Sequence, residues 1–165
     1  MKRTLFWSVA WLGLIAAGYL VTTQLTAEPP VARSLDKGKQ EIAIPVSRDG
    51  HYYLDGAVNG VPLRLMVDTG ATYVSVGADF AKAAGLPDGI TGYFKTANGT
   101  VEGKIVKDLD VQADAFHVSG LSVVVMPSQN GVGLLGQNFL RRFEVSQAAK
   151  VMRLRLPAEP APRGR

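Results

Sequence analysis

The chain has 165 residues, of which 47% are hydrophobic and 19% are charged, and its formal net charge is +4. This composition excludes a mainly disordered chain and leaves room for about one ordinary domain with short appendages. The chain has no cysteine, which excludes a disulfide scaffold, a zinc–thiolate site, an iron–sulfur cluster and a cysteine nucleophile within it. Because the excess basic residues gather toward the two ends and form no stripe interleaved with aromatics, we expect no nucleic-acid partner.

The N-terminal segment 1–27 has the composition of a membrane-spanning helix. Residues 4–27 contain no charged side chain, and a helix of that length is about 36 Å long, enough to cross a hydrocarbon core of about 30 Å. The alternative is a cleaved signal peptide, because Lys2 and Arg3 precede the apolar run and small residues occur at 16–18. Either interpretation places the rest of the chain on the periplasmic, extracytoplasmic side of the inner membrane.

Composition then divides the remainder of the chain into three parts. Residues 28–39 are polar with Pro and Gly and predict a tether, whereas the Pro-rich residues 157–165 predict a disordered tail. The folded domain is therefore expected over residues 40–156.

Within that domain, short apolar runs separated by glycine turns predict many short strands. Residues 52–58 and Val61–Val67 flank Asn59-Gly60, the strongest short hairpin signal, and a second hairpin is expected around Asn98-Gly99. Further strands are expected at 41–46, 109–112, 121–126 and 151–156, and short helices at 78–84 and 137–143. The pattern predicts a compact, barrel-like all-β domain with one or two short helices, preceded by the N-terminal transmembrane helix.

An ionisable residue stands at the end of the apolar strand 61–67, where Asp68 is followed by Thr69, Gly70 and Ala71. One interpretation is an Asx-turn, in which the carboxylate accepts backbone N–H groups and glycine supplies the bend. The other is a carboxylate that does chemistry. A second element, Leu134-Leu135-Gly136 leading into a short helix, favours the chemical interpretation.

Together these motifs resemble the retropepsin-like aspartic proteases, and most closely the bacterial membrane-anchored branch of that clan. The resemblance rests on LMVDTGAT at 65–72, TANGT at 96–100 in the place of the flap, and LLGQNFL at 134–140. The order and spacing of these segments match, and they span most of residues 40–156. The resemblance therefore implies a retropepsin-like acid-protease barrel.

The resemblance also implies a role for each matched residue. Asp68 would be the catalytic residue, and Thr69 would lock two active-site loops together across a two-fold axis. Gly70 and Ala71 would support the loop. The flap that covers the substrate would carry Ala97, Asn98 and Gly99, and the element that packs against the loop would be Leu134, Leu135 and Gly136.

Peptide hydrolysis by this route uses two carboxylates that share one proton and activate a water molecule between them. The chain contains one Asp-Thr-Gly, and its other Asp-Gly pairs, at 49, 55 and 88, read as turns. The second carboxylate must come from another copy, so activity implies a homodimer. Viral members of the family usually carry Arg where this chain has Gln137, so we expect a weaker interface. No metal or other cofactor is expected.

The remaining candidates favour structural or solvated roles. His51 and His117 have no metal-like spacing, and Asp108, Asp110 and Asp114 are typical of a solvated strand face more than of a cation site. The leading hypothesis is a membrane-anchored aspartic endopeptidase acting on protein or peptide substrates. The alternatives are a non-catalytic retropepsin-like binding or dimerisation module and an unrelated exported β-barrel ligand binder. The intact Asp-Thr-Gly favours the enzyme, because a scaffold does not need an Asp there.

Overall fold

The computed structural model describes residues 32–34, 38, 40–96, 99–129 and 131–158. In chain order its elements are β1 (Ala32–Ser34), β2 (Glu41–Pro45), β3 (Tyr53–Val58), β4 (Val61–Val67), β5 (Val74–Gly77), α2 (Ala78–Ala83), β6 (Ile90–Thr96), β7 (Gly99–Ala113), β8 (Phe116–Met126), β9 (Val132–Leu135), α3 (Gln137–Leu140), β10 (Glu144–Ala148) and β11 (Val151–Arg155).

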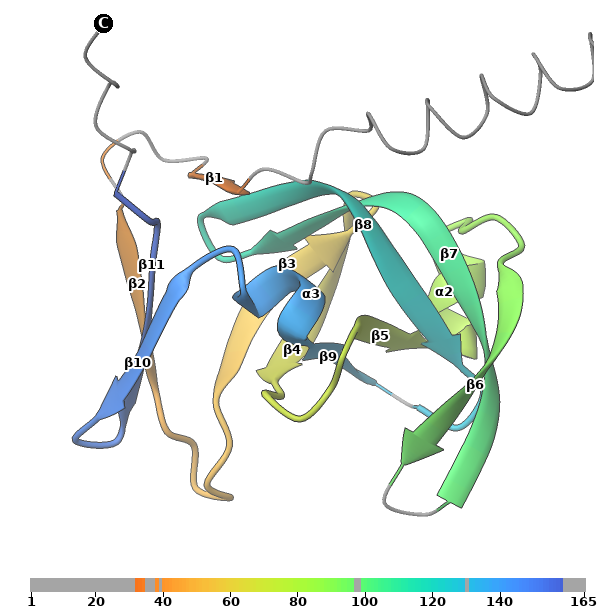
Figure 1. Cartoon of the computed structure of the whole chain (residues 1–165), viewed down its shortest axis with the longest axis horizontal. Coiled ribbons are helices and arrows are strands. Elements are labelled where there is room, and N and C mark those ends of the chain that lie inside the picture. The colour runs from red at the N-terminus through yellow and green to blue at the C-terminus, as the bar shows by residue number, and fades with distance from the viewer. Residues whose placement is uncertain (1–31, 35–37, 39, 97–98, 130, 159–165) are drawn as a thin grey trace, which may run out of the picture.

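The larger sheet closes on itself into a barrel. Its strand order is β1-β8-β5-β9-β4-β3-β7-β6, and β7 also pairs with β8, so the strands from β8 to β7 form a ring (Figure 1). Closure removes the open edges of the ringed strands. Only β1 and β6 extend beyond the ring, and β6 pairs with β7 alone. The barrel expected from the sequence is therefore confirmed.

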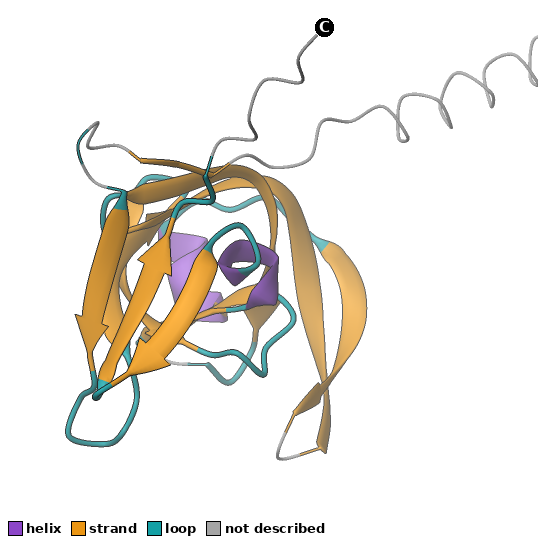
Figure 2. Ribbon diagram, turned by 60° about the vertical axis from the view of Figure 1, so that its left-hand side comes forward, coloured by secondary structure: helices purple, strands orange, loops and turns teal. Residues whose placement is uncertain are grey.

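A separate sheet of β10, β11 and β2 stands beside the barrel (Figure 2). It joins the first and last parts of the expected domain, because β11 pairs with both β10 and β2 in antiparallel register. Glu41 on β2 accepts hydrogen bonds from Arg153 and Arg155 on β11. The sheet lies at the opposite end of the molecule from β6 (Figure 1).

The first predicted hairpin is confirmed and shows why its sequence folds as it does. β3 pairs with β4, and Asn59 and Gly60 have φ of 52° and 78°. Two consecutive positive φ values match a type I′ turn, which Asn-Gly favours strongly. Leu65 and Val67 are buried on one face of β4 while Arg64 is exposed on the other, as the alternation predicts.

The core is apolar and includes a stack of three phenylalanine rings. The Phe116 and Phe143 ring centroids are 4.8 Å apart, and those of Phe139 and Phe143 are 5.0 Å apart. Phe116 lies on β8, and Phe139 lies on α3. Burial of these rings therefore fixes the short helix α3 against the barrel wall.

Several element boundaries differ from the sequence-based expectation. The helix expected over 137–143 ends at Leu140, because Phe143 packs into the core and β10 begins at Glu144. β10 was not expected at all. The strands expected at 109–112 and 121–126 are parts of the longer β7 and β8. The helix at Ala78–Ala83 is confirmed, and Gly85 follows it with φ of 61°.

The two ends of the chain are only partly described. The predicted anchor at 1–27 lies outside the described residues, and so does most of the predicted tail. Among the residues that the structure does describe, no helix is long and apolar enough to cross a bilayer. Within the predicted tether, residues Ala32–Ser34 form strand β1, which pairs with β8. Within the ring, β5 pairs with β8 only at residues 123–126, so residues 116–118 of β8 keep backbone groups free to pair with β1, which composition alone does not reveal.

Candidate active site

The site forms where β9 lies between two strands that are neighbours in the chain. β9 pairs in parallel with β4, with Val67 opposite Leu135, and antiparallel with β5, with Ser75 opposite Leu134. β4 and β5 therefore do not pair with each other. Residues 68–73, which connect them, pass over the end of β9. We call this segment the catalytic loop after the role that the sequence predicts for Asp68.

Asp68 begins this loop in a hydrogen-bonded turn. Its Oδ1 accepts from the Gly70 N–H at 2.9 Å, and its carbonyl accepts from the Ala71 N–H at 3.3 Å. Its own N–H donates to the Leu135 carbonyl at 3.2 Å, which fixes the loop to β9. The Asx-turn suggested by the sequence is thus present. It engages one carboxylate oxygen, and the Asp68 side chain is half-buried and lines a cavity.

The first residues of α3 donate hydrogen bonds to the catalytic loop. The Gln137 N–H donates to the Ala71 carbonyl at 2.8 Å, and the Asn138 N–H donates to the Thr72 carbonyl at 3.0 Å. The Gln137 side chain adds a third bond, from Nε2 to the Thr69 carbonyl at 2.9 Å. Three carbonyls of the loop are therefore fixed by two neighbouring residues.

The Asn138 side chain joins the loop to the barrel. Its Oδ1 accepts from the Val74 N–H at 2.8 Å, and its Nδ2 donates to the Ser122 carbonyl at 2.7 Å. Asn138 and Val74 are both buried, so the bond between them satisfies polar groups that are removed from water. Sequence reasoning did not single out Asn138. The available signal was the polar pair Gln137 and Asn138 between Gly136 and the apolar Phe139 and Leu140.

Gly136 is required by the close approach of α3 to the loop. A Cβ at this position would lie 2.3 Å from the Tyr73 carbonyl oxygen and 2.9 Å from that of Ala71. Both contacts are with backbone, so no side-chain rotation relieves them. The two leucines before Gly136 have different surroundings. Leu135 is fully buried in the core, whereas Leu134 lines the cavity.

The cavity has a volume of about 570 Å³ and lies between the catalytic loop and the strand β6. Its walls are Asp68, Gly70, Ala71, Thr72, Tyr73, Ser75, Tyr93, Phe94, Lys95, Thr96, Val124, Met126, Gln129 and Leu134. Asp68 is the one acidic side chain among these described wall residues.

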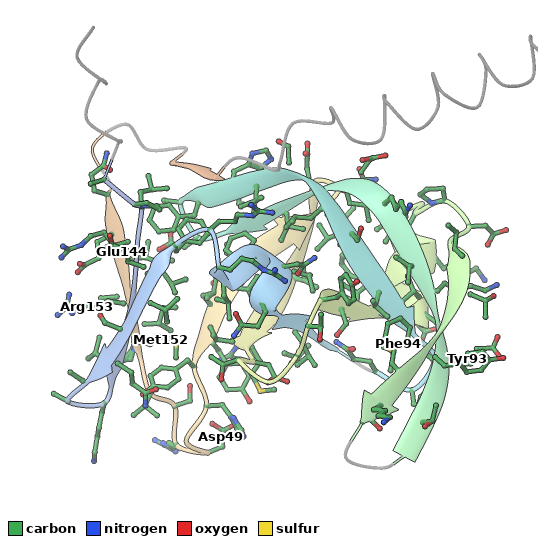
Figure 3. All side chains as sticks on the ribbon, viewed as in Figure 1. Asp49, Tyr93, Phe94, Glu144, Met152 and Arg153 are labelled. Carbon is green, nitrogen blue, oxygen red and sulfur yellow. The ribbon has the colours of Figure 1, made fainter. Side chains whose placement is uncertain are left out.

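The β6–β7 hairpin forms the opposite side of the cavity. Thr96 pairs with Gly99, and the Thr96 Oγ1 donates to the Gly99 carbonyl at 2.9 Å. The predicted flap residues Ala97 and Asn98 lie outside the described residues. Phe94 is half-buried, whereas Tyr93 is 72% exposed, and the two side chains leave β6 in different directions (Figure 3).

The histidines and the other acidic candidates lie outside this cavity. The His51 and Tyr53 rings are 6.4 Å apart, and the Tyr53 hydroxyl donates to Asp49 Oδ2 at 2.7 Å, which lowers the pKa of Asp49 below its usual range. His117 Nε2 is 3.7 Å from Asp110 Oδ2. In the described ranges, no three His, Asp or Glu side chains gather as metal ligands would. Asp108, Asp110 and Asp114 are exposed.

Comparison with known proteins places these features in a family. The sequence model of the family described as gag-polyprotein putative aspartyl protease matches residues 54–142, more than half of the chain. An uncharacterized protein of Rickettsia prowazekii (strain Madrid E) is 30% identical over 109 residues, covering 63% of this chain and 46% of that protein. The chain thus spans about half the length of this relative.

Among solved structures, the crystal structure of a retropepsin-like aspartic protease from Rickettsia conorii is similar. The TM-score is 0.59 at 23% sequence identity, and the match covers 77% of this chain and 94% of that one. At this identity the likeness shows the fold.

Proposed function

This chain belongs to the gag-polyprotein putative aspartyl protease family and has a retropepsin-like fold, and on that premise we propose that it is an endopeptidase with Asp68 as its catalytic carboxylate. The observation that carries the proposal is the position of Asp68. Its carboxylate lines a cavity large enough for peptide side chains, and β6 lies across that cavity. The proposed substrates are proteins or peptides.

The proposed chemistry is attack of water on a peptide carbonyl. An ionised carboxylate takes a proton from the water molecule while the water oxygen bonds to the carbonyl carbon. At the same time a protonated carboxyl donates its proton to the carbonyl oxygen. The C–N bond then breaks as the first carboxyl gives the proton that it took from water to the leaving nitrogen. The second carboxylate takes a proton back from a hydroxyl of the tetrahedral intermediate, which restores the starting pair. This sequence needs two carboxyl groups, one as base and one as acid.

A homodimer is proposed because one chain supplies one such group. Asp68 is the one acidic residue among the described residues of the cavity wall. A two-fold axis beside the catalytic loop would bring a second Asp68 to the first. The bonds from Gln137 and Asn138 to the loop support this role, because a catalytic group must be held in place by its neighbours.

Substitution of Asp68 tests the proposed catalytic role. We expect Asp68→Asn to keep the fold and reduce peptide cleavage below about a hundredth of wild type, because an amide cannot take the proton from water. Asp55→Asn is the matched control, since Asp55 is exposed on β3 and outside the cavity wall. Activity retained by Asp68→Asn would instead favour the non-catalytic binding module.

Mixing the two chains tests the proposed homodimer. After subunit exchange, an equal amount of Asp68→Asn chain should reduce the activity of a fixed amount of wild type by about half, because half of the wild-type chains then lie in mixed dimers. Asp55→Asn chain should have no such effect. A single-chain mechanism predicts that added Asp68→Asn chain leaves the wild-type activity unchanged. Added Asp55→Asn chain, which is itself active, raises the total activity under either mechanism.

We also propose, from the sequence of residues 1–27, that the chain is anchored in the inner membrane with its domain on the periplasmic side. A reporter that works only outside the cytoplasm, fused after residue 156, should be active. Activity of a cytoplasm-only reporter at the same position would contradict this location, without bearing on the proposed chemistry.

A further inference from the structure

Two polar side chains form a hydrogen-bonded pair in the cavity wall. The Ser75 hydroxyl on β5 donates to Gln129 Oε1 at 2.8 Å. Gln129 Nε2 donates to two backbone carbonyls, that of Ser75 at 3.0 Å and that of Val132 at 2.9 Å. The two carbonyl partners identify which amide atom is nitrogen and which is oxygen. We call these side chains the Ser75–Gln129 pair.

The pair retains hydrogen-bond acceptors and no donors. A glutamine amide has two N–H groups, and both are used on backbone carbonyls. The serine hydroxyl has one hydrogen, and it is used on Gln129. Ser75 Oγ and Gln129 Oε1 can each still accept a hydrogen bond from a group in the cavity. A group bound there can form a hydrogen bond only by donating one.

The neighbouring cavity wall is apolar. Val124, Met126, Leu134 and Phe94 line the same cavity, and Val124 is only 2% exposed. Ser75 itself is 7% exposed. A substrate side chain that fills this part of the cavity would exclude water from the pair. Any acceptor left without a donor would then be desolvated at a cost.

We propose that the Ser75–Gln129 pair determines specificity, by selecting a substrate side chain that is apolar along its length and ends in a hydrogen-bond donor. The inference rests on the proposed peptidase function and adds a substrate class to it. Tyrosine is selected over phenylalanine, and threonine over valine, because each favoured member supplies the missing donor at nearly the same size. Sites built around a hydrogen bond reject the analogue that lacks it more strongly than apolar pockets reject a size change.

Matched peptides test the proposal with the full chain. A peptide that the wild type cleaves is first found in a proteome-derived library, and Phe/Tyr and Val/Thr pairs are then placed at each position around the scissile bond. We expect one position at which the donor-bearing member has the higher kcat/KM by about tenfold. Equal kcat/KM within every pair at every position would overturn the proposal while leaving the peptidase function intact.

Two variants assign the preference to the pair. Gln129→Met removes the acceptor and frees the Ser75 hydroxyl to donate, so the preference should fall to about one or reverse. Ser75→Ala leaves the Gln129 oxygen in place, so the preference should persist. Gln112→Met is the matched control, because Gln112 also bonds a backbone carbonyl, that of Asp114, but lies outside the cavity wall. An equal loss for both members of each pair in Gln129→Met would indicate a purely structural role and overturn the proposal.

Binding separates this inference from the proposed chemistry. Phe/Tyr and Val/Thr pairs built on library peptides that bind the Asp68→Asn chain are titrated against that chain, and the donor-bearing members should bind more tightly by a similar factor. That preference is expected whether or not the wild type cleaves them, so absence of cleavage with preferential binding would refute only the peptidase function. Equal binding within all pairs would refute the inference.

Discussion

The two sides of the cavity are built in opposite ways. On one side, the catalytic loop is bonded through the carbonyls of Thr69, Ala71 and Thr72 to the start of α3. On the other, β6 is an edge strand that pairs with β7 alone, and it carries two of the exposed large hydrophobic side chains among the described residues, Ile90 and Tyr93. The difference matches the proposed chemistry, since reacting carboxylates must stay fixed whereas a cover must admit and release substrate.

The largest expected effect is the loss of stability when a methyl group is added at Gly136 on the loop side. The same change at Gly92 on the β6 side is the comparison. Gly136→Ala places a Cβ against the backbone of Tyr73 and Ala71, and we expect a loss of about 3 kcal/mol or more in unfolding free energy. Gly92→Ala on β6 meets only the ends of the Phe94 and Ile105 side chains, at 3.2 and 3.3 Å, which can rotate away. Chemical denaturation of both variants measures the difference. Equal losses would show that the flap side is packed as rigidly as the loop side.

Removing the buried amide behind the loop should have the next largest effect. Asn138→Ala leaves the buried Val74 N–H and the Ser122 carbonyl without their partner, so we expect a loss of about 2–3 kcal/mol in unfolding free energy. Cleavage activity at a temperature where the variant is still folded should also fall, because the loop loses its link to the barrel. Gln147→Ala, at an exposed position on β10, is the control for both measurements. A change no larger than that of the control would show that the loop does not depend on Asn138.

On the flap side, activity and stability should separate. Phe94 lines the cavity and lies against Gly92 and Gly103, so Phe94→Ala should lower kcat/KM by about tenfold while changing the melting temperature little. Ile90→Ala, on the same strand but 64% exposed and outside the cavity wall, should change neither. A large drop in melting temperature with Phe94→Ala would place this ring among the fixed parts of the molecule.

The smallest effect on stability is expected from a substitution in the three-stranded sheet, which is remote from both sides of the cavity. Figure 3 labels Arg153 in this sheet. Hydrogen bonds from Arg155 and Arg153 lower the pKa of the Glu41 carboxyl below its usual range. A carboxyl with a lowered folded-state pKa stabilises the fold above its ordinary pKa, and that contribution is lost as pH falls through the lowered value. Glu41→Gln should therefore lower the melting temperature slightly at neutral pH, and the difference should vanish in acid.

Thermal scans of both proteins from neutral to acidic pH measure this difference, and activity per folded molecule should stay unchanged. A difference that persists in acid would assign the effect to something other than the Glu41 charge.

The sequence predicts those elements whose local signal is strong. Asn59-Gly60 specifies its hairpin because few other residues adopt two positive φ values readily. The turn between β10 and β11 has the same backbone form, with φ of 48° at Ala149 and 64° at Lys150, but neither residue signals it. We attribute that hairpin to the pairing of β11 with β2, which lies at the other end of the domain sequence. A local sequence pattern cannot predict such a distant pairing.

The same limit applies to the candidate site. Asp68 and Gly136 stand out because their residue types have narrow structural uses. The partnership of Ser75 with Gln129 joins residues 54 positions apart, and neither residue type is unusual where it occurs. Gln137 could be noticed as a departure from the viral pattern, yet its bond to the Thr69 carbonyl within its own chain becomes visible only when α3 is placed against the loop.

The position of β9 between β4 and β5 also restricts when the site can form during folding. β4 and β5 cannot close as a simple hairpin, because a space must remain for a strand that is made much later. Val74 and its partner Asn138 are 64 residues apart, and contacts so distant in sequence form slowly. The catalytic loop therefore takes its final shape only after residues 132–140 have been synthesised and have inserted. We therefore expect a nascent or truncated chain that lacks residues 132–140 to have no assembled site and, under the proposed function, no protease activity.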